Sequence, residues 1–344
     1  MKILAYMVGI LALLCAVSTV DARPFTDSAG RTVEIPDSIG KVLAAGPPAS
    51  VIVYTLAPQK LAGWVREPGE TDKTFLLPET RALPTYGRLT GKGGTANVEA
   101  VIAARPDLII DVGTINDTYI SLADKVQQQT GIPYILIDGS ILKTADTYRL
   151  TGNLLGVPDR AADLADYADK VLRDVRTIAS QIPEKNRPRV YYGRGPDGME
   201  TGLKNSINVE ILEVAGAVNA AAAGTGGLTN VSLEQILQWN PETILASDKS
   251  FAKEVAGDDR WAGVAAIKAH RVFTTPSSPF GWFDTPPGVN RLIGILWLEH
   301  LFYPAEAEGN LRNEVKQFYK LFYQVDVSDQ QLDELLDGAL PRTP

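Results

Sequence analysis

The chain has 344 residues and a formal net charge of −8, and its single cysteine, Cys15, lies close to the amino terminus. An acidic chain without a basic stretch is poorly suited to bind nucleic acid, because such binding depends on lysine and arginine that neutralise phosphates. About 320 residues can bury two sizeable cores without disulfides, and the absence of cysteine after residue 22 excludes a thiolate zinc site there.

Residues 1–22 are typical of a secretory signal peptide. A basic start is followed by a mostly apolar run at 3–20 and by Val20-Asp21-Ala22, which places small residues where a signal peptidase reads. The alternative is a membrane anchor, but the apolar run is short for a bilayer span. Lipid attachment at Cys15 is disfavoured because two leucines precede it, where a small residue is preferred. We therefore expect a periplasmic protein that is cleaved after Ala22.

Residues 23–157 indicate an amino-terminal lobe in which strands and helices alternate. Apolar runs bounded by turn residues predict the strands, and a helix is expected after Pro47-Pro48. A Gly-rich loop at 84–96 precedes a short helix that begins near Val98. In chain order we expect a hairpin in 24–36, strands at 42–45, 61–65, 108–112 and 134–137, and a helix at 119–129.

A connecting helix is predicted over residues 158–183. Its apolar residues recur at spacings of three and four along one face, namely Leu164, Tyr167, Val171, Val175, Ile178 and Ile182. At 1.5 Å per residue such a helix is roughly 36 Å long, about the width of a lobe. It is expected to hold two lobes apart, and an ordinary surface helix is the alternative.

A carboxyl-terminal lobe is expected at 184–304, with strands near Val190, at 243–246 and at 272–274. A tail at 305–344 contains two helices with polar faces, at 311–323 and 329–336. The predicted fold class is α/β: two Rossmann-like β/α lobes with mostly parallel sheets, joined by one long helix.

Two segments with an offset of 135 positions are nearly alike. NVEAVIAARPDLIIDVG begins at Asn97 and VSLEQILQWNPETILAS at Val231, so that Glu99 aligns with Glu234. In each copy a carboxylate opens a short helix, a proline follows, and an aliphatic run predicts a buried strand. A duplicated unit of this kind predicts two similar lobes with a cleft between them.

Two loops are expected to line that cleft. YYGRGPDG at 191–198 contains the spacing G-x-G-x-x-G, but no helix follows at once, so a dinucleotide site is disfavoured. A loop at the carboxyl end of a strand is a common place for ligand contacts, and Tyr191, Tyr192 and Arg194 would then face the cleft. Arg88 lies beside GKGGT (91–95), which lacks the spacing of a phosphate loop, and is either a cleft residue or a surface arginine.

The segment at 277–304 is the richest in aromatic residues. Phe280, Trp282 and Phe283 follow a predicted strand and are expected to form an apolar wall around an organic ligand, with a hydrophobic plug as the alternative. Asp284 has three open roles: to bind a cation, to orient Arg194, or to cap the next helix. No catalytic set is visible, and neither histidine has a partner nearby in sequence, so we expect neither enzymatic activity nor a metal site.

Taken together, these segments resemble the periplasmic binding proteins that deliver iron-siderophores, haem and cobalamin to ABC importers. The resemblance covers the whole mature chain and is carried by GRTVEIPDSIGKVLAAGPPAS, the two repeat segments, the long helix, YYGRGPDGMETG and WAGVAAIKAHRVFTTPSSPFGWFDTPPGVNRLIG. It implies a ligand between the lobes, no cofactor, a monomer, and an importer permease dimer with its ATPase as partner. It also implies that Glu99 and Glu234 dock onto arginines of the permease.

The ligand that the resemblance implies is a small metal complex, and the aromatic residues favour a ferric siderophore. Cobalamin, haem and molybdate or tungstate are alternatives, although no histidine is placed as a haem ligand. Proteins of another class, an exported sensory or interaction protein or an enzyme using the same cleft, stay as further alternatives. The residues expected to bind the ligand are Tyr54, Arg88, Tyr191, Tyr192, Arg194, Trp282, Phe283 and Asp284.

Overall fold

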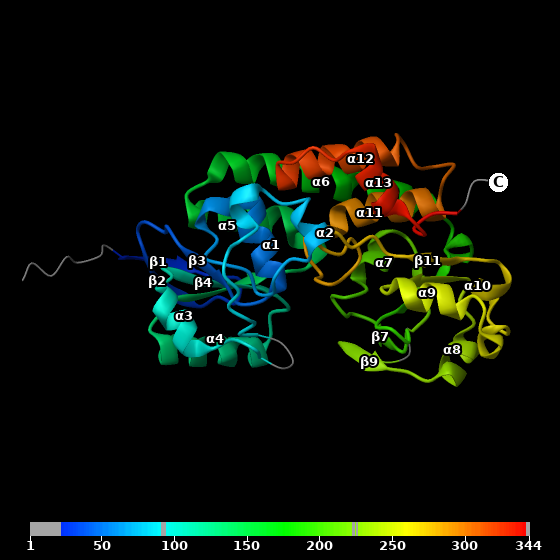
Figure 1. Cartoon of the computed structure of the whole chain (residues 1–344), viewed down its shortest axis with the longest axis horizontal. Coiled ribbons are helices and arrows are strands. Elements are labelled where there is room, and N and C mark those ends of the chain that lie inside the picture. The colour runs from blue at the N-terminus through cyan, green and yellow to red at the C-terminus, as the bar shows by residue number, and fades with distance from the viewer. Residues whose placement is uncertain (1–21, 91–93, 222–223, 225, 342–344) are drawn as a thin grey trace, which may run out of the picture.

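The computed structural model describes residues 22–90, 94–221, 224 and 226–341. Two lobes lie side by side, and a layer of helices runs across one side of both (Figure 1). The expected signal peptide lies outside the described residues except for Ala22, which begins the first strand, and residues 91–93 of GKGGT also lie outside them. Within the described residues, no helix combines the length and the apolar character that crossing a membrane requires.

The amino-terminal lobe contains a hairpin and a parallel sheet of order β3-β4-β5. The expected strand at 61–65 is not formed, and only isolated bridges join Leu61 to Val42 and Trp64 to Thr85. The elements are β1 Ala22–Thr26, β2 Thr32–Pro36, β3 Val42–Ala44, α1 Pro47–Leu56, α2 Glu70–Lys73, α3 Val98–Ala104, β4 Leu108–Gly113, α4 Asp117–Thr130, β5 Tyr134–Asp138 and α5 Thr144–Leu155.

The carboxyl-terminal lobe contains a parallel sheet of order β11-β10-β6-β8 and a small hairpin of β7 and β9. Its elements are β6 Arg189–Gly193, β7 Glu200–Gly202, α7 Glu210–Val214, β8 Val218–Asn219, β9 Leu228–Asn230, α8 Leu233–Trp239, β10 Thr243–Ala246, α9 Lys249–Val255, α10 Ala265–Lys268, β11 Val272–Thr274 and α11 Arg291–Phe302.

The connecting helix is α6, which spans Pro158–Gln181 and has 24 residues. Its buried side chains follow the predicted face, and Pro158 occupies the first turn, where a missing N–H costs nothing. The tail forms α12 Leu311–Phe318, a π-helical turn Tyr319–Tyr323 and α13 Asp329–Leu336, and these lie beside α6 and α11 across both lobes (Figure 1). The α/β fold with two lobes and one long helix is confirmed.

Alternating strand residues divide the core into three parts. In β4, Ile110 packs in the large shared core while Ile109 packs in a core confined to the amino-terminal lobe. In β6, Tyr192 likewise joins the shared core and Tyr191 joins a core confined to the carboxyl-terminal lobe. Successive side chains of a strand point to opposite faces of the sheet. One face of each sheet therefore packs in a core of its own lobe, and the other face joins the shared core, where α1 and α5 pack on the amino-terminal sheet.

The repeat predicted from the sequence is a structural repeat. Helices α3 and α8 each have seven residues and end in a left-handed residue, Arg105 and Asn240. The carboxylate of Asp107 accepts hydrogen bonds of 2.8 Å from the amides of Gly40 and Lys41, and Glu242 accepts one of 3.0 Å from the amide of Arg189. The aligned acidic residues therefore hold the chain just before, or at the start of, the neighbouring parallel strand in both lobes.

Candidate ligand-binding cleft

A cavity of about 650 Å³ lies between the two lobes. This volume falls in the range of sites that enclose small organic ligands. The amino-terminal lobe contributes the start of α1, the loop around Arg88 and the end of β4, and the carboxyl-terminal lobe contributes Arg194, Asn208 and the loop 279–287. The cleft expected from the duplicated unit is therefore present.

The sheet topology explains the position of this cavity. From β6 the chain moves first to β8 on one side and later to β10 on the other, so the carboxyl end of β6 lies at a switch point. From β3 it moves to the bridge at Leu61 on one side and to β4 on the other. Ligands of open α/β sheets bind at such points, and Gly46 and Arg194 follow these two strands into the cavity wall.

On the amino-terminal wall, Ser50 of α1 and Thr90 are buried; the Ser50 hydroxyl has no hydrogen-bond partner, and the Thr90 hydroxyl has only the neighbouring carboxylate of Asp111. Gly46 lies against Thr90, because a Cβ atom at Gly46 would approach the Thr90 Cγ2 to 2.8 Å. Buried hydroxyl groups are usually paired. The Ser50 hydroxyl, which lines the cavity without a partner, is therefore free to donate to a ligand, and the Thr90 hydroxyl can do so in place of its contact with Asp111.

Asp111 at the end of β4 is the acid of this wall. Its Oδ2 atom accepts a hydrogen bond of 3.0 Å from the hydroxyl of Tyr134, and Thr90 faces the same carboxylate. Burial raises the pKa of Asp111, and it also raises the pKa of Asp72, another carboxyl group that lines the cavity. Both groups therefore hold a proton more readily than exposed aspartates do.

Arg88 lines the cavity and has no ion pair among the described residues, and Arg66 is a second cation of the lining. Of the two alternatives for Arg88, a cleft residue or a surface arginine, its place in the cavity lining supports the first. A contact of Arg88 with a ligand stays a prediction.

The carboxyl-terminal wall is a network of charges. The Nε atom of Arg194 lies 2.7 Å from the Oδ2 atom of Asp284, and Arg194 also forms an ion pair with Glu200. Asn208 donates a hydrogen bond of 2.8 Å to the other oxygen of Asp284. Of the three roles left open for Asp284, the structure supports the orientation of Arg194. The next helix, α11, begins at Arg291, with Asn290 at its N-cap.

Five of the predicted ligand contacts are corrected. Tyr54, Tyr191, Tyr192, Trp282 and Phe283 are fully buried and do not line the cavity. Because Tyr191 and Tyr192 are successive residues of β6, they point to opposite faces of the sheet. The aromatic pair after β11 is part of the hydrophobic plug, since Trp282 donates to the hydroxyl of Tyr319 in the tail and Phe283 packs on Tyr192.

The hydroxyl of Tyr54 has two partners of its own, the carbonyl of Tyr323 and the amide of Leu77. Burial raises the pKa of this tyrosine to about 12. It is a core residue that ties α1 to the tail.

Of the three aromatic residues expected to form an apolar wall, only Phe280 lines the cavity. Trp64, with its ring centroid 5.9 Å from that of Phe280, was not among the predicted contacts, nor were Asp111, Ser50 and Thr90. Asp111 could have been found, because a carboxylate at the carboxyl end of an otherwise aliphatic strand marks the ligand side of a parallel sheet. Ser50 and Thr90 carry no comparable signal in the sequence.

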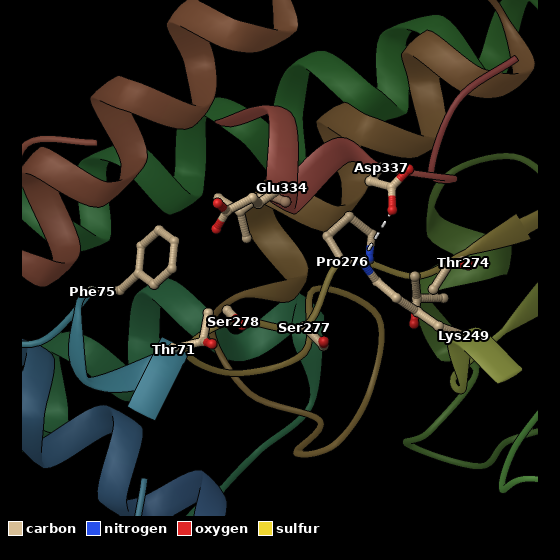
Figure 2. Close-up of a pocket in the computed structure, with 11 residues that line it drawn as sticks. Thr71, Phe75, Lys249, Thr274, Pro276, Ser277, Ser278, Glu334 and Asp337 are labelled. Carbon is tan, nitrogen blue, oxygen red and sulfur yellow. Dashed lines mark hydrogen bonds and ion pairs between the residues drawn. The ribbon is translucent and has the colours of Figure 1, made fainter. Parts of the chain in front are cut away.

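A second cavity of about 240 Å³ lies where α2, the loop after β11 and α13 meet (Figure 2). Lys249 and Asp337 form an ion pair of 3.5 Å at one side, and Thr71 and Phe75 approach from the other side (Figure 2). The lysine is already paired and the volume is small, so the interlobe cavity is the stronger candidate for a ligand site.

The described residues contain no cluster of histidine, cysteine, aspartate or glutamate suited to hold a metal ion. His300 lies 3.1 Å from a carboxylate oxygen of Glu314, away from the cavity. The two acids predicted to dock onto a permease, Glu99 and Glu234, are both exposed, each in the first turn of its helix.

Comparison with known families gives a match over residues 60–279 to the family described as periplasmic binding protein. The chain is 26% identical to the molybdate-binding protein MolA of Haemophilus influenzae, over 94% of this chain and 97% of that protein. It is 27% identical to a vitamin B12-binding protein of Salmonella choleraesuis, over 58% of this chain and 73% of that protein.

Among solved structures, an ABC transporter solute binding protein from Sulfurospirillum deleyianum matches with a TM-score of 0.84 and 29% identity, over 92% of this chain and 99% of that chain. The structure of MolA bound to molybdate matches with a TM-score of 0.74 over 89% of this chain and 99% of that chain. At 23% identity the latter shows a shared fold.

Proposed function

The chain belongs to the periplasmic binding protein family, and we propose that it captures a metal oxyanion of the molybdate or tungstate class and delivers it to an ABC importer. Members of the family are solute-binding proteins rather than enzymes. One relative, which matches 94% of the chain, is described as molybdate-binding, and others are described as binding cobalamin. The ligand class is therefore argued from the residues of the cavity.

The observation that carries the proposal is the set of unpaired donors on the amino-terminal wall. Ser50 offers a buried hydroxyl group without a partner, Thr90 offers one that faces only the Asp111 carboxylate, and Arg88 offers a positive charge without an ion pair among the described residues. A tetrahedral oxyanion accepts hydrogen bonds on every oxygen and donates none, so it fits a wall of donors. Hydrogen bonds that involve a charged group are stronger than neutral ones.

Two further features support an anion. The cavity wall includes the first residues of α1, and the amino-terminal end of a helix carries a partial positive charge. Burial raises the pKa of Asp111, so this residue repels an anion over a narrower pH range than an exposed aspartate does.

A ferric siderophore, which the sequence favoured, is the second candidate. The loss of Trp282 and Phe283 from the cleft removes the main reason for that preference. The cavity volume of about 650 Å³ and the aromatic pair Trp64 and Phe280 still favour an organic shell. A ferric catecholate such as ferric enterobactin is anionic like an oxyanion and would also use Arg88, whereas ferrichrome is neutral.

Calorimetric titration distinguishes these candidates. We expect saturable binding of sodium molybdate and sodium tungstate, with weak or no binding of ferric enterobactin, ferrichrome and cobalamin. Because Trp64 lines the cavity, its fluorescence is expected to change on binding. Binding of a ferric chelate without binding of either oxyanion would replace the first candidate by the second. No response to any of these compounds would contradict the proposal as a whole.

Three variants locate the oxyanion. Arg88→Gln, Ser50→Ala and Thr90→Val each remove a donor, and each is expected to weaken molybdate binding by about 1.5–3 kcal/mol, the worth of a hydrogen bond to a charged group. Arg176→Gln, an exposed change on α6, is the matched control for the first. Because the Ser50 hydroxyl has no partner in the protein, its removal is expected to leave the melting temperature unchanged or raised.

A further inference from the structure

Helices α3 and α8 share a second surface feature besides their glutamates. Ile102 is 43% exposed and Leu237 is 38% exposed, and the offset of the repeat aligns these two positions. Among the described residues only two other large hydrophobic side chains are equally open to solvent, Val98 of α3 and Leu142. Three of the four are therefore on the repeated helices, and two are at the same position of the repeat.

Each of these aliphatic residues lies three positions after the exposed glutamate of its helix, Ile102 after Glu99 and Leu237 after Glu234. Residues three apart are neighbours on the surface of a helix. Neither glutamate has an ion pair among the described residues. A hydrogen bond with Ser232 lowers the pKa of Glu234, which keeps this carboxylate ionised.

Packing within each lobe does not account for the exposed residues. Between Glu99 and Ile102 lies Val101, which is buried, and its counterpart Ile236 is buried as well. These buried residues anchor the helices. Single exposed aliphatic residues are ordinary, but the same exposed pair in both copies of a repeat indicates a shared requirement at the surface.

The two helices lie at opposite ends of the molecule, on the side away from α6 (Figure 1). They are held in the same way, by an N-cap side chain, a left-handed carboxyl end and an acidic residue that binds the backbone near a neighbouring strand. The two surfaces are thus presented at a fixed separation, which suits a partner with two equivalent sites.

Docking through Glu99 and Glu234 is what the family resemblance implies, and we propose that Ile102 and Leu237 add an apolar contact beside each glutamate. The partner is the permease dimer of the importer, so the inference rests on the proposed function. Each of its two sites is expected to combine an arginine with an apolar rim. The glutamate sets the orientation and the rate of association, and the aliphatic side chain adds affinity when it leaves water.

The test measures docking and ligand binding separately. The protein is titrated against the permease and ATPase complex of its own host's importer, held in nanodiscs, by biolayer interferometry at low and high salt. Molybdate affinity and melting temperature are measured for the same variants. The double variant Ile102→Ser with Leu237→Ser is compared with Leu142→Ser, which is an equally exposed change outside the repeat.

We expect the double variant to bind the complex at least about tenfold more weakly, because burying an isoleucine or leucine side chain contributes at least that much to the binding constant. Its salt dependence should match that of the unmodified protein, whereas Glu99→Gln with Glu234→Gln should reduce the salt dependence. Leu142→Ser should bind as the unmodified protein does, and molybdate affinity should stay unchanged in all variants.

Equal docking by the double variant and the unmodified protein would overturn this inference and leave the proposed function intact. An equal loss in the Leu142→Ser variant would also overturn it, because the effect would not be specific to the repeat. Failure of the unmodified protein to bind the complex would overturn both the inference and the delivery role.

Discussion

At the scale of single residues, Asp111 gives the cleft a dependence on pH. Burial raises its pKa above the usual value of about 3.9, so the free protein loses this proton at a higher pH than an exposed aspartate does. A bound oxyanion is stabilised by the protonated form and repelled by the ionised form. Molybdate affinity is therefore expected to be highest at low pH and to fall, by up to about tenfold per pH unit, above the pKa of Asp111.

Calorimetry at several pH values between about 4, the usual carboxyl pKa, and 8 measures this dependence. The variant Asp111→Asn keeps a neutral side chain at every pH and should give a flat profile. The same slope in the variant and in the unmodified protein would assign the pH dependence to another group.

Arg194 has a structural role that the sequence did not reveal. Its guanidinium group lies against the buried carboxylate of Asp284, so Arg194→Ala leaves a buried charge without its partner. Breaking a buried ion pair in this way costs about 3–5 kcal/mol. We expect urea denaturation to show a loss of this order for Arg194→Ala. Adding Asp284→Asn should recover part of it, and an unchanged midpoint in the single variant would contradict this role.

The cleft was predictable from the sequence only in part, and the reasons are physical. Arg88, Arg194 and Asp284 are polar and follow strands, so the rule that ligands bind beyond the carboxyl ends of parallel strands brings them to the cavity. The aromatic residues were misplaced because their partners are remote in the sequence. Trp282 is bonded to Tyr319, whose position depends on the packing of the whole tail.

At the scale of elements, a helix could be predicted from the sequence where apolar residues recur strongly at helical spacing, and was missed where that pattern is weak. The connecting helix expected at 158–183 is observed at Pro158–Gln181 because seven buried apolar residues mark one face. Helix α5 was missed, although its buried residues also recur at helical spacing, because several of them are threonine and glycine. Such residues do not stand out as an apolar stripe.

The repeated unit makes a prediction at this scale. Asp107 accepts two backbone amide hydrogen bonds next to β3, and Glu242 accepts one at the start of β6. Asp107→Ala and Glu242→Ala are each expected to lower the free energy of unfolding by about 0.5–1.5 kcal/mol, the net worth of an ordinary hydrogen bond.

Glu254→Ala is the control, because Glu254 is exposed on α9 and accepts no hydrogen bond from the described residues. Chemical denaturation followed by circular dichroism measures all three variants. If Glu254→Ala lowered the free energy of unfolding as much as the other two variants do, the effect would come from the change in surface charge and not from the hydrogen bonds of the repeat.

At the scale of the whole molecule, the shared core limits how far the lobes can move. It joins residues of β4 and β6 to α6, α11 and the tail without interruption. The tail is thus part of the main core, since Phe318, Phe322 and Tyr323 are fully buried in it. A hinge closure would have to shear this packed layer, and packed cores do not deform continuously.

Polar bonds fasten the lobes at the same place. Arg291 at the start of α11 donates a hydrogen bond of 2.6 Å to the carbonyl of Gly139 in the amino-terminal lobe and forms an ion pair of 2.5 Å with Glu210. Glu210 in turn accepts a hydrogen bond of 2.6 Å from the amide of Ile141. The amino-terminal lobe is thus bonded to the carboxyl-terminal lobe through a buried charged pair.

We therefore expect the radius of gyration, measured by small-angle X-ray scattering, to stay the same within error when molybdate is added at saturating concentration. The double variant Arg291→Met with Glu210→Met removes the polar fastening and keeps the apolar volume, so any ligand-induced compaction should be larger in the variant. A clear compaction of the unmodified protein would show that the helical layer bends. The importer would then recognise a closed form rather than a nearly rigid one.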